Sequence, residues 1–234
     1  MSLTYLAVET DIAVHERESM FWLSRGISSV RVSSMREAIE IVQTKKFLFI
    51  GINSSNIDYL PLLRLLREST NDPIFISSNA YTMQEQGVAI ENGADLFGQL
   101  SDNPNDNFNS CMAAIKRLDE RASQRKKPVA ILYHGNILVA PTYHKAFVND
   151  AEIKLTKAEM AILRSLMINK GAILTHNQIF ETVYDGEFVE SISDNIYSTV
   201  KRLRKKINEA GGCDCIETIK DVGYRLRTRN DTIY

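Results

Sequence analysis

Short apolar runs alternate with segments of helical periodicity through the first half of the chain. Residues 3–8, 27–32, 47–50, 73–77 and 95–97 read as buried strands, and residues 13–24, 35–44, 60–68, 83–91 and 107–122 between them suit helices. Strands separated by crossover helices predict βαβ units, and therefore a five-stranded parallel sheet with helices on both faces. The polar, basic stretch 123–128 ends in Pro128 and interrupts this pattern, so we place a linker there, between domains 1–122 and 129–234.

The second half has a different pattern, in which short strands frame three helices. Strand-like runs at 129–133, 137–140 and 146–148 come first, and runs at 215–219 and 224–227 come last. Thr156, with Glu159 three residues later, forms a capping box that predicts the start of the first helix. A second helix suits residues 175–184, with Thr175 as its cap, and a third suits residues 191–208 before Gly211.

The third of these helices carries the strongest sign of function. Its apolar residues recur at helical spacing and define one buried stripe, formed by Ile192, Ile196, Val200, Leu203 and Ile207. The opposite face is polar and cationic, with Asp194, Ser198, Lys201, Arg202 and Lys205 on it and Asn195 and Lys206 at its edges. A helix fits the major groove of DNA, where small polar groups and an arginine can read base edges and lysines can neutralise phosphates. The alternative is a solvated basic face that only complements the helix dipole.

The segment after this helix reads as a hairpin with Gly223 near its turn. Lys220 and Arg225 would project cations towards the DNA backbone or minor groove. A hairpin is also an ordinary end for a domain, and Tyr224 could then belong to the core.

Charge is divided unevenly between the two halves, although the net charge is only −1. Residues 1–120 contain 10 Lys and Arg against 16 Asp and Glu, and the remaining residues contain 18 against 13. The basic second half favours a polyanionic partner. No apolar run is long enough to span a membrane and the N-terminus has no secretion signal, so we expect a cytoplasmic protein without a membrane partner.

The three cysteines, Cys111, Cys213 and Cys215, are an odd number, which favours a reduced intracellular protein over a disulfide framework. Cys213 and Cys215 could form half of a metal site, but no second cysteine pair or spaced histidine pair completes it in the sequence. We therefore predict no metal and no cofactor.

Together these motifs resemble the effector domain of OmpR/PhoB-type response regulators. The resemblance covers about residues 129–227 and rests on Leu155, Thr156 and Glu159, on the turn at 171–175, on the basic helix and on the closing segment 216–225. It implies a winged helix-turn-helix, in which the third helix enters the major groove and the hairpin is the wing. The DNA-binding residues expected from the residue pattern and the resemblance are Asn195, Ser198, Thr199, Lys201, Arg202, Arg204, Lys205, Lys220, Tyr224 and Arg225. Asp221 departs from the family pattern, which has glycine there, and could weaken phosphate contact by the wing or alter its turn.

In the first half, the order of elements, the fourth-strand run 73–78 and the stretch 92–95 before the fifth strand resemble the receiver domain of the same family over about residues 3–121. The fold class is then α/β, with an N-terminal doubly wound five-stranded parallel-sheet receiver-like domain and a C-terminal winged helix-turn-helix domain of the α+β kind. The resemblance implies a transcriptional regulator rather than an enzyme, double-stranded DNA as its partner, and RNA polymerase as a further candidate. It also implies a homodimer formed through residues 83–91, 95–97 and 107–122.

The receiver-like half lacks most of the family's phosphorylation chemistry. A receiver accepts a phosphoryl group on an aspartate at the end of its third strand, beside Mg²⁺-binding acids and a lysine on the fifth strand. Here Gly51 stands at the acceptor position, Thr10 replaces the second acid after Glu9, and Leu100 replaces the lysine. Ser78 matches the family's Ser/Thr position. Because Mg²⁺ needs hard oxygen ligands and a phosphoryl group needs a cation, we predict a receiver-like domain that is not phosphorylated on aspartate.

Two alternatives stay open at this point. A shift of one or two residues in the alignment could bring Asp11 or Asp58 to the site, and the chain would then be a conventional response regulator with a sensor kinase. The second half could instead be a protein-interaction module, which the absence of salt-dependent binding to duplex DNA would reveal.

Overall fold

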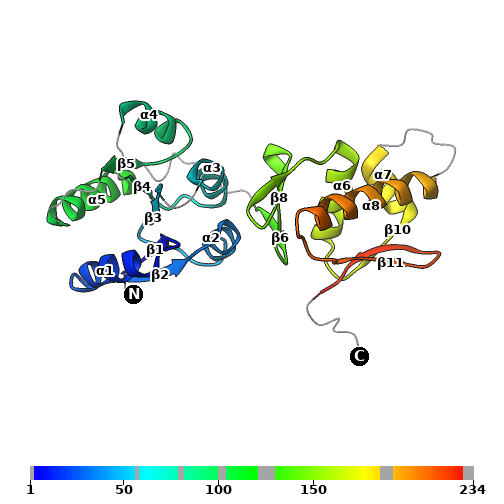
Figure 1. Cartoon of the computed structure of the whole chain (residues 1–234), viewed down its shortest axis with the longest axis horizontal. Helices are drawn as coiled ribbons and strands as arrows, with labels where there is room; N and C mark the ends of the chain where they lie inside the picture. Colours follow the sequence, from blue (N-terminus) through cyan, green and yellow to red (C-terminus); the bar gives the residue numbers. More distant parts are fainter. Residues whose placement is uncertain are drawn as a thin grey trace. The chain divides into compact units, whose positions relative to one another are not determined.

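The computed structural model describes residues 3–55, 58–78, 82–99, 104–120, 130–184 and 192–228. The chain divides into two compact units, Met1–Ala130 and Ile131–Tyr234 (Figure 1). The predicted linker at 123–128 lies outside the described residues. Among the helices of the described residues, none is both long and apolar enough to cross a membrane.

The first unit is built on a parallel five-stranded sheet in the order β2-β1-β3-β4-β5. Its strands are β1 (Leu3–Val8), β2 (Ile27–Val32), β3 (Ile50–Asn53), β4 (Ile74–Ser78) and β5 (Leu96–Gln99), and its helices are α1 (Ile12–Leu23), α2 (Met35–Val42), α3 (Tyr59–Ser69), α4 (Met83–Glu91) and α5 (Pro104–Asp119). An aromatic cluster on one face packs α1 and α5 against the sheet through Tyr5, Trp22, Phe49 and Phe75. The doubly wound parallel fold predicted from the sequence is confirmed.

The third strand begins later than the apolar pattern predicts. Phe47, Phe49 and Ile50 of the run at 47–50 are buried and Leu48 is half-buried, but the strand occupies Ile50–Asn53. The Phe47 N–H donates to the buried carboxylate of Asp72 (2.9 Å), whereas the Leu48 N–H already donates to the Thr4 carbonyl of β1 (2.8 Å). The strand then continues past the apolar run to Asn53.

The second unit has two small antiparallel sheets around three helices. One sheet has the order β6-β7-β8-β9, from β6 (Leu132–His134), β7 (Ile137–Ala140), β8 (Lys145–Val148) and β9 (Ala151–Ile153). The helices are α6 (Lys157–Ile168), α7 (His176–Tyr184) and α8 (Ile192–Glu209), and a 3-10 turn, η2, spans Pro141–Tyr143. The other sheet has the order β10-β12-β11, from β10 (Ile173–Thr175), β11 (Ile216–Ile219) and β12 (Gly223–Leu226). This arrangement is the winged helix-turn-helix that the sequence predicted.

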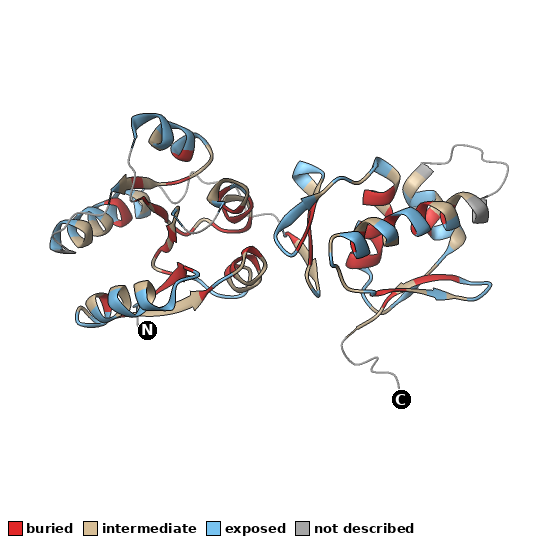
Figure 2. Ribbon diagram, viewed as in Figure 1, coloured by how far each residue is buried: buried red, intermediate tan, exposed pale blue. Residues whose placement is uncertain are grey.

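The stripe predicted on α8 forms the centre of this unit's core. Ile196, Val200, Leu203 and Ile207 are each at most 1% exposed and pack in one cluster with residues of α6, α7 and the sheets. The side chain of Ile192 lies outside the described residues. Figure 2 shows the result, a helix with a buried side and an exposed side.

The hairpin β11–β12 is held against β10 by an unusually close approach of the backbones. Gly223 pairs with Thr175 of β10 and with Ile219 of β11. A Cβ atom at Gly223 would lie 2.0 Å from the carbonyl oxygen of Leu174. Only glycine fits at this position, so Gly223 sets the position of the hairpin beside the helices.

Candidate nucleic-acid interface

The outward side of α8 presents a compact cationic face. Lys201, Arg202 and Lys205 are exposed, and Ser198 lies half-buried one turn before Lys201 and Arg202. Lys205 Nζ also lies 3.7 Å from Glu209 Oε1 in an exposed i,i+4 ion pair. Such a surface pair contributes little to the stability of the fold. We call Ser198, Lys201, Arg202 and Lys205 the α8 face. It combines a hydroxyl, a guanidinium and two ammonium groups.

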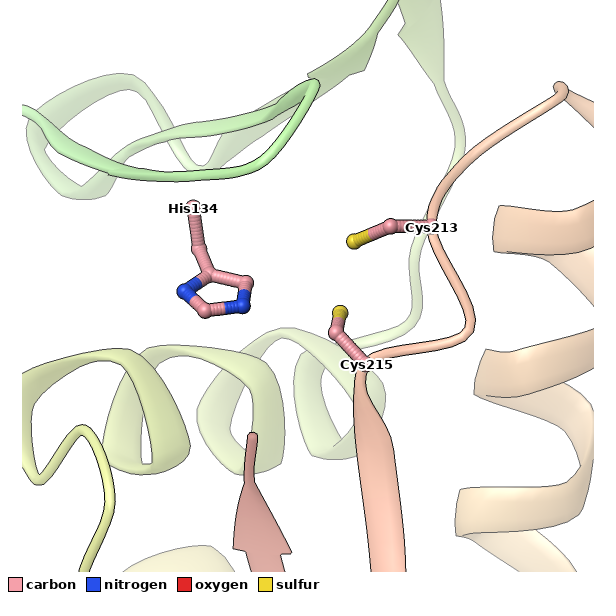
Figure 3. Close-up of side chains that lie close together, drawn as sticks. All are labelled: His134, Cys213 and Cys215. Atoms are coloured by element: carbon pink, nitrogen blue, oxygen red, sulfur yellow. The ribbon is translucent and has the colours of Figure 1, made fainter. Parts of the chain in front are cut away.

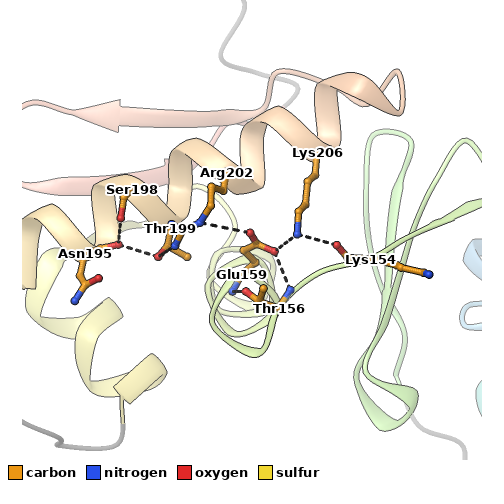
Figure 4. A network of polar contacts seen from close by, with 8 residues as sticks. All are labelled: Lys154, Thr156, Glu159, Asn195, Ser198, Thr199, Arg202 and Lys206. Atoms are coloured by element: carbon orange, nitrogen blue, oxygen red, sulfur yellow. Dashed lines mark hydrogen bonds and ion pairs between the residues drawn. The ribbon is translucent and has the colours of Figure 1, made fainter.

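A buried carboxylate fixes one flank of α8 to α6 (Figure 4). Glu159 is fully buried, and its Oε2 accepts hydrogen bonds from the Thr156 N–H (2.8 Å) and from Lys206 Nζ (2.7 Å). The Thr156 side chain accepts from the Glu159 N–H, which completes the predicted capping box. Burial alone would raise the pKa of Glu159, but the hydrogen bonds from Lys206 and Thr156 outweigh it and hold this pKa below 4.5. Lys206, which also donates to the Lys154 carbonyl, is therefore turned towards α6 and away from the α8 face.

Arg202 lies at the edge of this network and remains open to solvent. Its Nη2 donates to Thr199 Oγ1 (3.1 Å), and its Nε lies 3.9 Å from Glu159 Oε1. The Arg202 side chain is nevertheless 60% exposed. Thr199 is itself buried and donates to the carbonyl of Asn195 (2.8 Å). The sequence-based assignment placed Thr199 among the DNA-binding residues, but the structure places its hydroxyl inside, where it positions Arg202.

Asn195 and Ser198 lie on the first half of the described helix, and both are half-buried. The Ser198 hydroxyl donates to the Asn195 carbonyl (3.0 Å), as serine commonly does within a helix. That bond uses the hydroxyl hydrogen and leaves the oxygen lone pairs as acceptors.

The opposite flank of α8 is fixed to the wing. Arg204 Nη2 donates to the Ile216 carbonyl (2.7 Å) and to Thr218 Oγ1 (2.9 Å), and its guanidinium lies over the ring of Tyr224. Tyr224 is 1% exposed and its ring also meets His176 edge-on. Arg204 and Tyr224 were both assigned to DNA from the sequence, but in the structure their contacts hold β11 and β12 against the helices. Both flanks of α8 are thus tied down, which gives the α8 face a defined orientation.

The wing presents fewer cations than the sequence suggested. Arg225 is engaged by Glu217 on the facing strand, at 2.6 and 2.9 Å from one carboxylate oxygen. Lys220 is exposed near the turn. Asp221 in that turn has φ +61°, the left-handed region that favours glycine. The family's glycine at this position is explained by that backbone conformation, and here an exposed carboxylate occupies it.

An exposed aromatic residue was missed by the sequence analysis. Tyr197 is 59% exposed and precedes Lys201 by one helical turn. The sequence could have predicted this exposure, because Tyr197 falls outside the apolar stripe that α8 buries.

The receiver-like edge of the first unit holds an amide where phosphorylation chemistry needs an acid. Asn53, the last residue of β3, donates from Nδ2 to Oε2 of the buried Glu9 (2.9 Å). The sequence placed the acceptor position at Gly51, but Gly51 is the second residue of the strand and Asn53 occupies the strand end. A Cβ at Gly51 would make only ordinary contacts, 3.6 Å from Phe49 and 3.9 Å from the Leu6 carbonyl. Ser78 ends β4 and is buried, Thr10 is exposed, and Leu100 lies outside the described residues.

The two acids that a shifted alignment would use lie at helix starts. Asp11 caps α1, because its Oδ1 accepts from the N–H groups of Ala13 (2.8 Å) and Val14 (3.3 Å). Asp58 is exposed and directly precedes α3. The capping role of Asp11 gives this side chain a structural use within the unit.

Known proteins resemble this chain over its second unit and over its whole length. Residues 150–226 match the family model described as "Transcriptional regulatory protein, C terminal". The chain is 19% identical to the regulatory protein VanR of Enterococcus faecium over 229 residues, covering 97% of this chain and 99% of VanR. It is 25% identical to the response regulator MprA of Mycolicibacterium vanbaalenii over 232 residues, covering 97% and 98%. The crystal structure of DrrB, described as a Thermotoga maritima OmpR/PhoB homologue, matches with a TM-score of 0.41 and 21% identity, covering 97% of this chain and 100% of DrrB. The second unit thus matches the C-terminal domain of transcriptional regulatory proteins, and the chain as a whole is similar to response regulators such as VanR and MprA.

Proposed function

We propose that this protein is a sequence-specific regulator of transcription that binds double-stranded DNA and acts independently of aspartate phosphorylation. The observation that supports the first part is the α8 face, a cationic helix surface held on both flanks by buried polar contacts. A helix of this kind can enter the major groove as a rigid unit, because its orientation is set before DNA arrives.

The exposed side chains divide into two roles. Arg202 is the candidate base reader, since a guanidinium can donate two hydrogen bonds to a guanine edge, and Asn195 and Ser198 flank it. Lys201, Lys205 and Lys220 are candidate phosphate contacts, because exposed ammonium groups displace the counterions of DNA without reading its sequence. Arg204, Tyr224 and Thr199 support this surface from within, and Arg225 is paired with Glu217.

Paired substitutions on α8 test this division of roles. An operator is first obtained by footprinting or by selection from random duplexes. Arg202→Ala should then lose about 1–3 kcal/mol of operator affinity and narrow the gap to random DNA. Lys205→Ala should weaken binding to all sequences alike and lower the salt slope of binding by about one unit.

The exposed Lys116 of α5 provides the charge-matched control, because Lys116→Ala removes a cation from the other unit. Melting curves show whether Arg202→Ala, which also loses its contacts with Thr199 and Glu159, keeps its fold. An unchanged footprint and affinity in a folded Arg202→Ala protein would contradict the proposed reading face, as would a Lys205→Ala loss confined to one operator.

We infer that the protein binds DNA as a homodimer, because two linked modules on tandem half-sites bind far more tightly than one. Within the expected surface, Phe97 is buried and Asp95 bonds to Arg67 (2.7 Å), so these two residues serve the fold of the unit. Phe108 and Met112 likewise pack against the aromatic core. The exposed apolar side chains on α4 are better candidates for a contact, and they are Met83, Val88 and Ile90. Analytical ultracentrifugation should show a dimer at micromolar concentration without a phosphodonor, and a monomer both free and on DNA would refute the inference.

A further inference from the structure

Three side chains of types that can bind a metal ion come together in the second unit (Figure 3). They are His134 at the end of β6, and Cys213 and Cys215, which lie between α8 and β11. Their possible ligand atoms all lie within 4.8 Å of one another. Ligands of a tetrahedral zinc ion are about 3.5–3.8 Å apart, given metal distances near 2.3 Å to sulfur and 2.0–2.1 Å to nitrogen. Small rotations of these side chains would therefore bring all three to one ion.

The backbone around the cluster is fixed by hydrogen bonds between the two segments. Asn136, in the turn after His134, accepts from the Cys213 N–H (3.0 Å) and donates to the Gly211 carbonyl (2.9 Å). Gly135 has φ +57°, and a Cβ there would lie 3.0 Å from Cys213 Sγ, so this turn lies against the thiol. On the other side, the Cys215 carbonyl accepts from the Arg227 N–H (2.8 Å). The cluster is thus held together before any ion binds.

The donor set selects one class of ion. Two thiolates and a neutral imidazole offer sulfur and nitrogen, which suit Zn²⁺, whereas Mg²⁺ and Ca²⁺ require oxygen ligands. The two thiolates balance the charge of a divalent cation at a place where Cys215 is buried and the other two side chains are half-buried. The Asp214 carboxylate points to another partner, because it lies 3.5 Å from Arg227 Nη2. The fourth position of the ion would be left to water.

We propose that His134, Cys213 and Cys215 form a zinc site that ties β6 to the connection between α8 and β11. The sequence analysis discounted Cys213 and Cys215 because the chain shows no second ligand pair. The missing ligand is a single histidine far away in the sequence, beside the β6–β7 turn whose Asn136 bonds to Cys213 and Gly211. None of the three residues belongs to the α8 face, so the zinc site and the proposed DNA recognition can be tested independently.

Cobalt substitution tests the site in the full chain, purified with a phosphine reductant and without metal. One equivalent of Co²⁺ should produce the thiolate-to-cobalt charge-transfer band and the visible bands of a four-coordinate ion, and equimolar Zn²⁺ should abolish both. Cys215→Ser and Cys213→Ser should lose most of the charge-transfer band, and His134→Gln should weaken binding at least about tenfold. Cys111→Ser is the matched control: its thiol is in the other unit, where burial raises its pKa to about 12, and the variant should bind like the wild type.

A second measurement on the wild type keeps the proposal testable if a variant fails to fold. Zn²⁺ should raise the melting temperature and slow the alkylation of Cys213, followed by mass spectrometry of the peptide that contains it. Three outcomes would overturn the proposal. They are the absence of a charge-transfer band at equimolar Co²⁺, an unchanged band in folded Cys215→Ser, and alkylation of Cys213 that ignores Zn²⁺. A Cys213–Cys215 disulfide that persists under the reductant would overturn it too, in favour of a redox pair.

Discussion

Glu159 shows how much of this DNA-binding unit depends on one residue. Its carboxylate closes the capping box of α6, accepts a hydrogen bond from Lys206 of α8 and lies 3.9 Å from Arg202. The sequence predicted the capping box from the spacing of Thr156 and Glu159. It gave no sign of the link to α8, because a local motif does not tell which side chain from another helix will meet the buried carboxylate.

Glu159→Gln should destabilise the second unit by about 1–3 kcal/mol at neutral pH, because a charge-assisted hydrogen bond to Lys206 becomes a neutral one. The effect should depend on pH in a defined direction. The pKa of Glu159 is lower in the folded state, so its stabilisation is complete above the unfolded value of 4.5 and is lost as the pH falls through the folded value. The wild type and the variant should therefore become more alike in acid.

Urea unfolding at a series of pH values measures this difference. Glu181→Gln is the matched control, since Glu181 is an exposed glutamate on α7 in the same unit, and its substitution should change the unfolding free energy by less than about 0.5 kcal/mol. A Glu159→Gln effect of equal size at neutral and acid pH would show that packing, and not charge, is the source of the stabilisation.

At the scale of elements, the strongly periodic segments were predictable and the short ones were not. The α8 stripe repeats over four turns. α4 also begins and ends at the predicted residues, although its apolar pattern is weak and only Ala89 of it is buried. The strands β9 and β10 have three residues each and were missed. For β9 a signal existed, because Asn149 and Asp150 both adopt positive φ, the conformation of a tight hairpin turn that these residue types favour.

Some polar residues predicted for the candidate site turn inward in the structure, for a physical reason. Helical spacing tells which residues share a face, and it correctly placed Lys201, Arg202 and Lys205 outside. It does not tell which polar side chains at the edge of that face turn inward to serve buried carbonyls or hydroxyls, as Arg204 and Thr199 do. The His134, Cys213 and Cys215 cluster was unpredictable for a related reason, since it depends on pairing between distant segments.

The position of Asp221 in the wing leads to a prediction about DNA affinity. Asp221→Asn removes a carboxylate beside Lys220 but keeps a residue type that tolerates φ +61°. If the wing lies near phosphates, the variant should bind DNA about twofold more tightly at low salt, with little dependence on sequence. Fluorescence anisotropy at several salt concentrations measures this affinity.

Asp221→Ala separates the effect of the charge from the effect of the backbone conformation. It should gain the same affinity while losing about 1 kcal/mol of stability to the strained φ. Equal affinities of Asp221→Asn and wild type at every salt concentration would place the wing tip away from the DNA backbone.

At the scale of the whole molecule, the two units have opposite electrostatic characters. The first unit carries the excess of acidic residues, and the second carries the excess of basic ones. The receiver-like sheet is retained in full, with its strand order and aromatic core, while Asn53 and Glu9 bond to each other at its carboxyl edge.

The absence of an acceptor leads to the sharpest test of phosphorylation independence. Incubation with acetyl phosphate and Mg²⁺ should add no phosphoryl mass to the protein, because the glycine at position 51 offers no nucleophile and the Asn53 amide cannot form the usual acyl phosphate. Operator affinity should be the same with and without the donor once ionic strength is matched. Intact-mass spectrometry and an operator shift assay on the same samples measure both quantities.

Gly51→Asp introduces an aspartate at the acceptor position predicted from the sequence. It tests whether the missing aspartate alone accounts for the expected lack of phosphorylation. Gly51→Asp should fold, because a Cβ at this position meets Phe49 and the Leu6 carbonyl only at ordinary contact distances. It should still not be phosphorylated. Thr10 leaves the Mg²⁺ site one acid short, and the leucine at position 100 supplies no cation for the phosphoryl group. A melting curve confirms the fold of the variant before the donor is added.

Stoichiometric phosphorylation of the wild type together with tighter operator binding would identify a conventional response regulator with a shifted site. Phosphorylation of Gly51→Asp alone would show that the remaining side chains at this edge still support the chemistry, and that the acceptor is the one part that was lost.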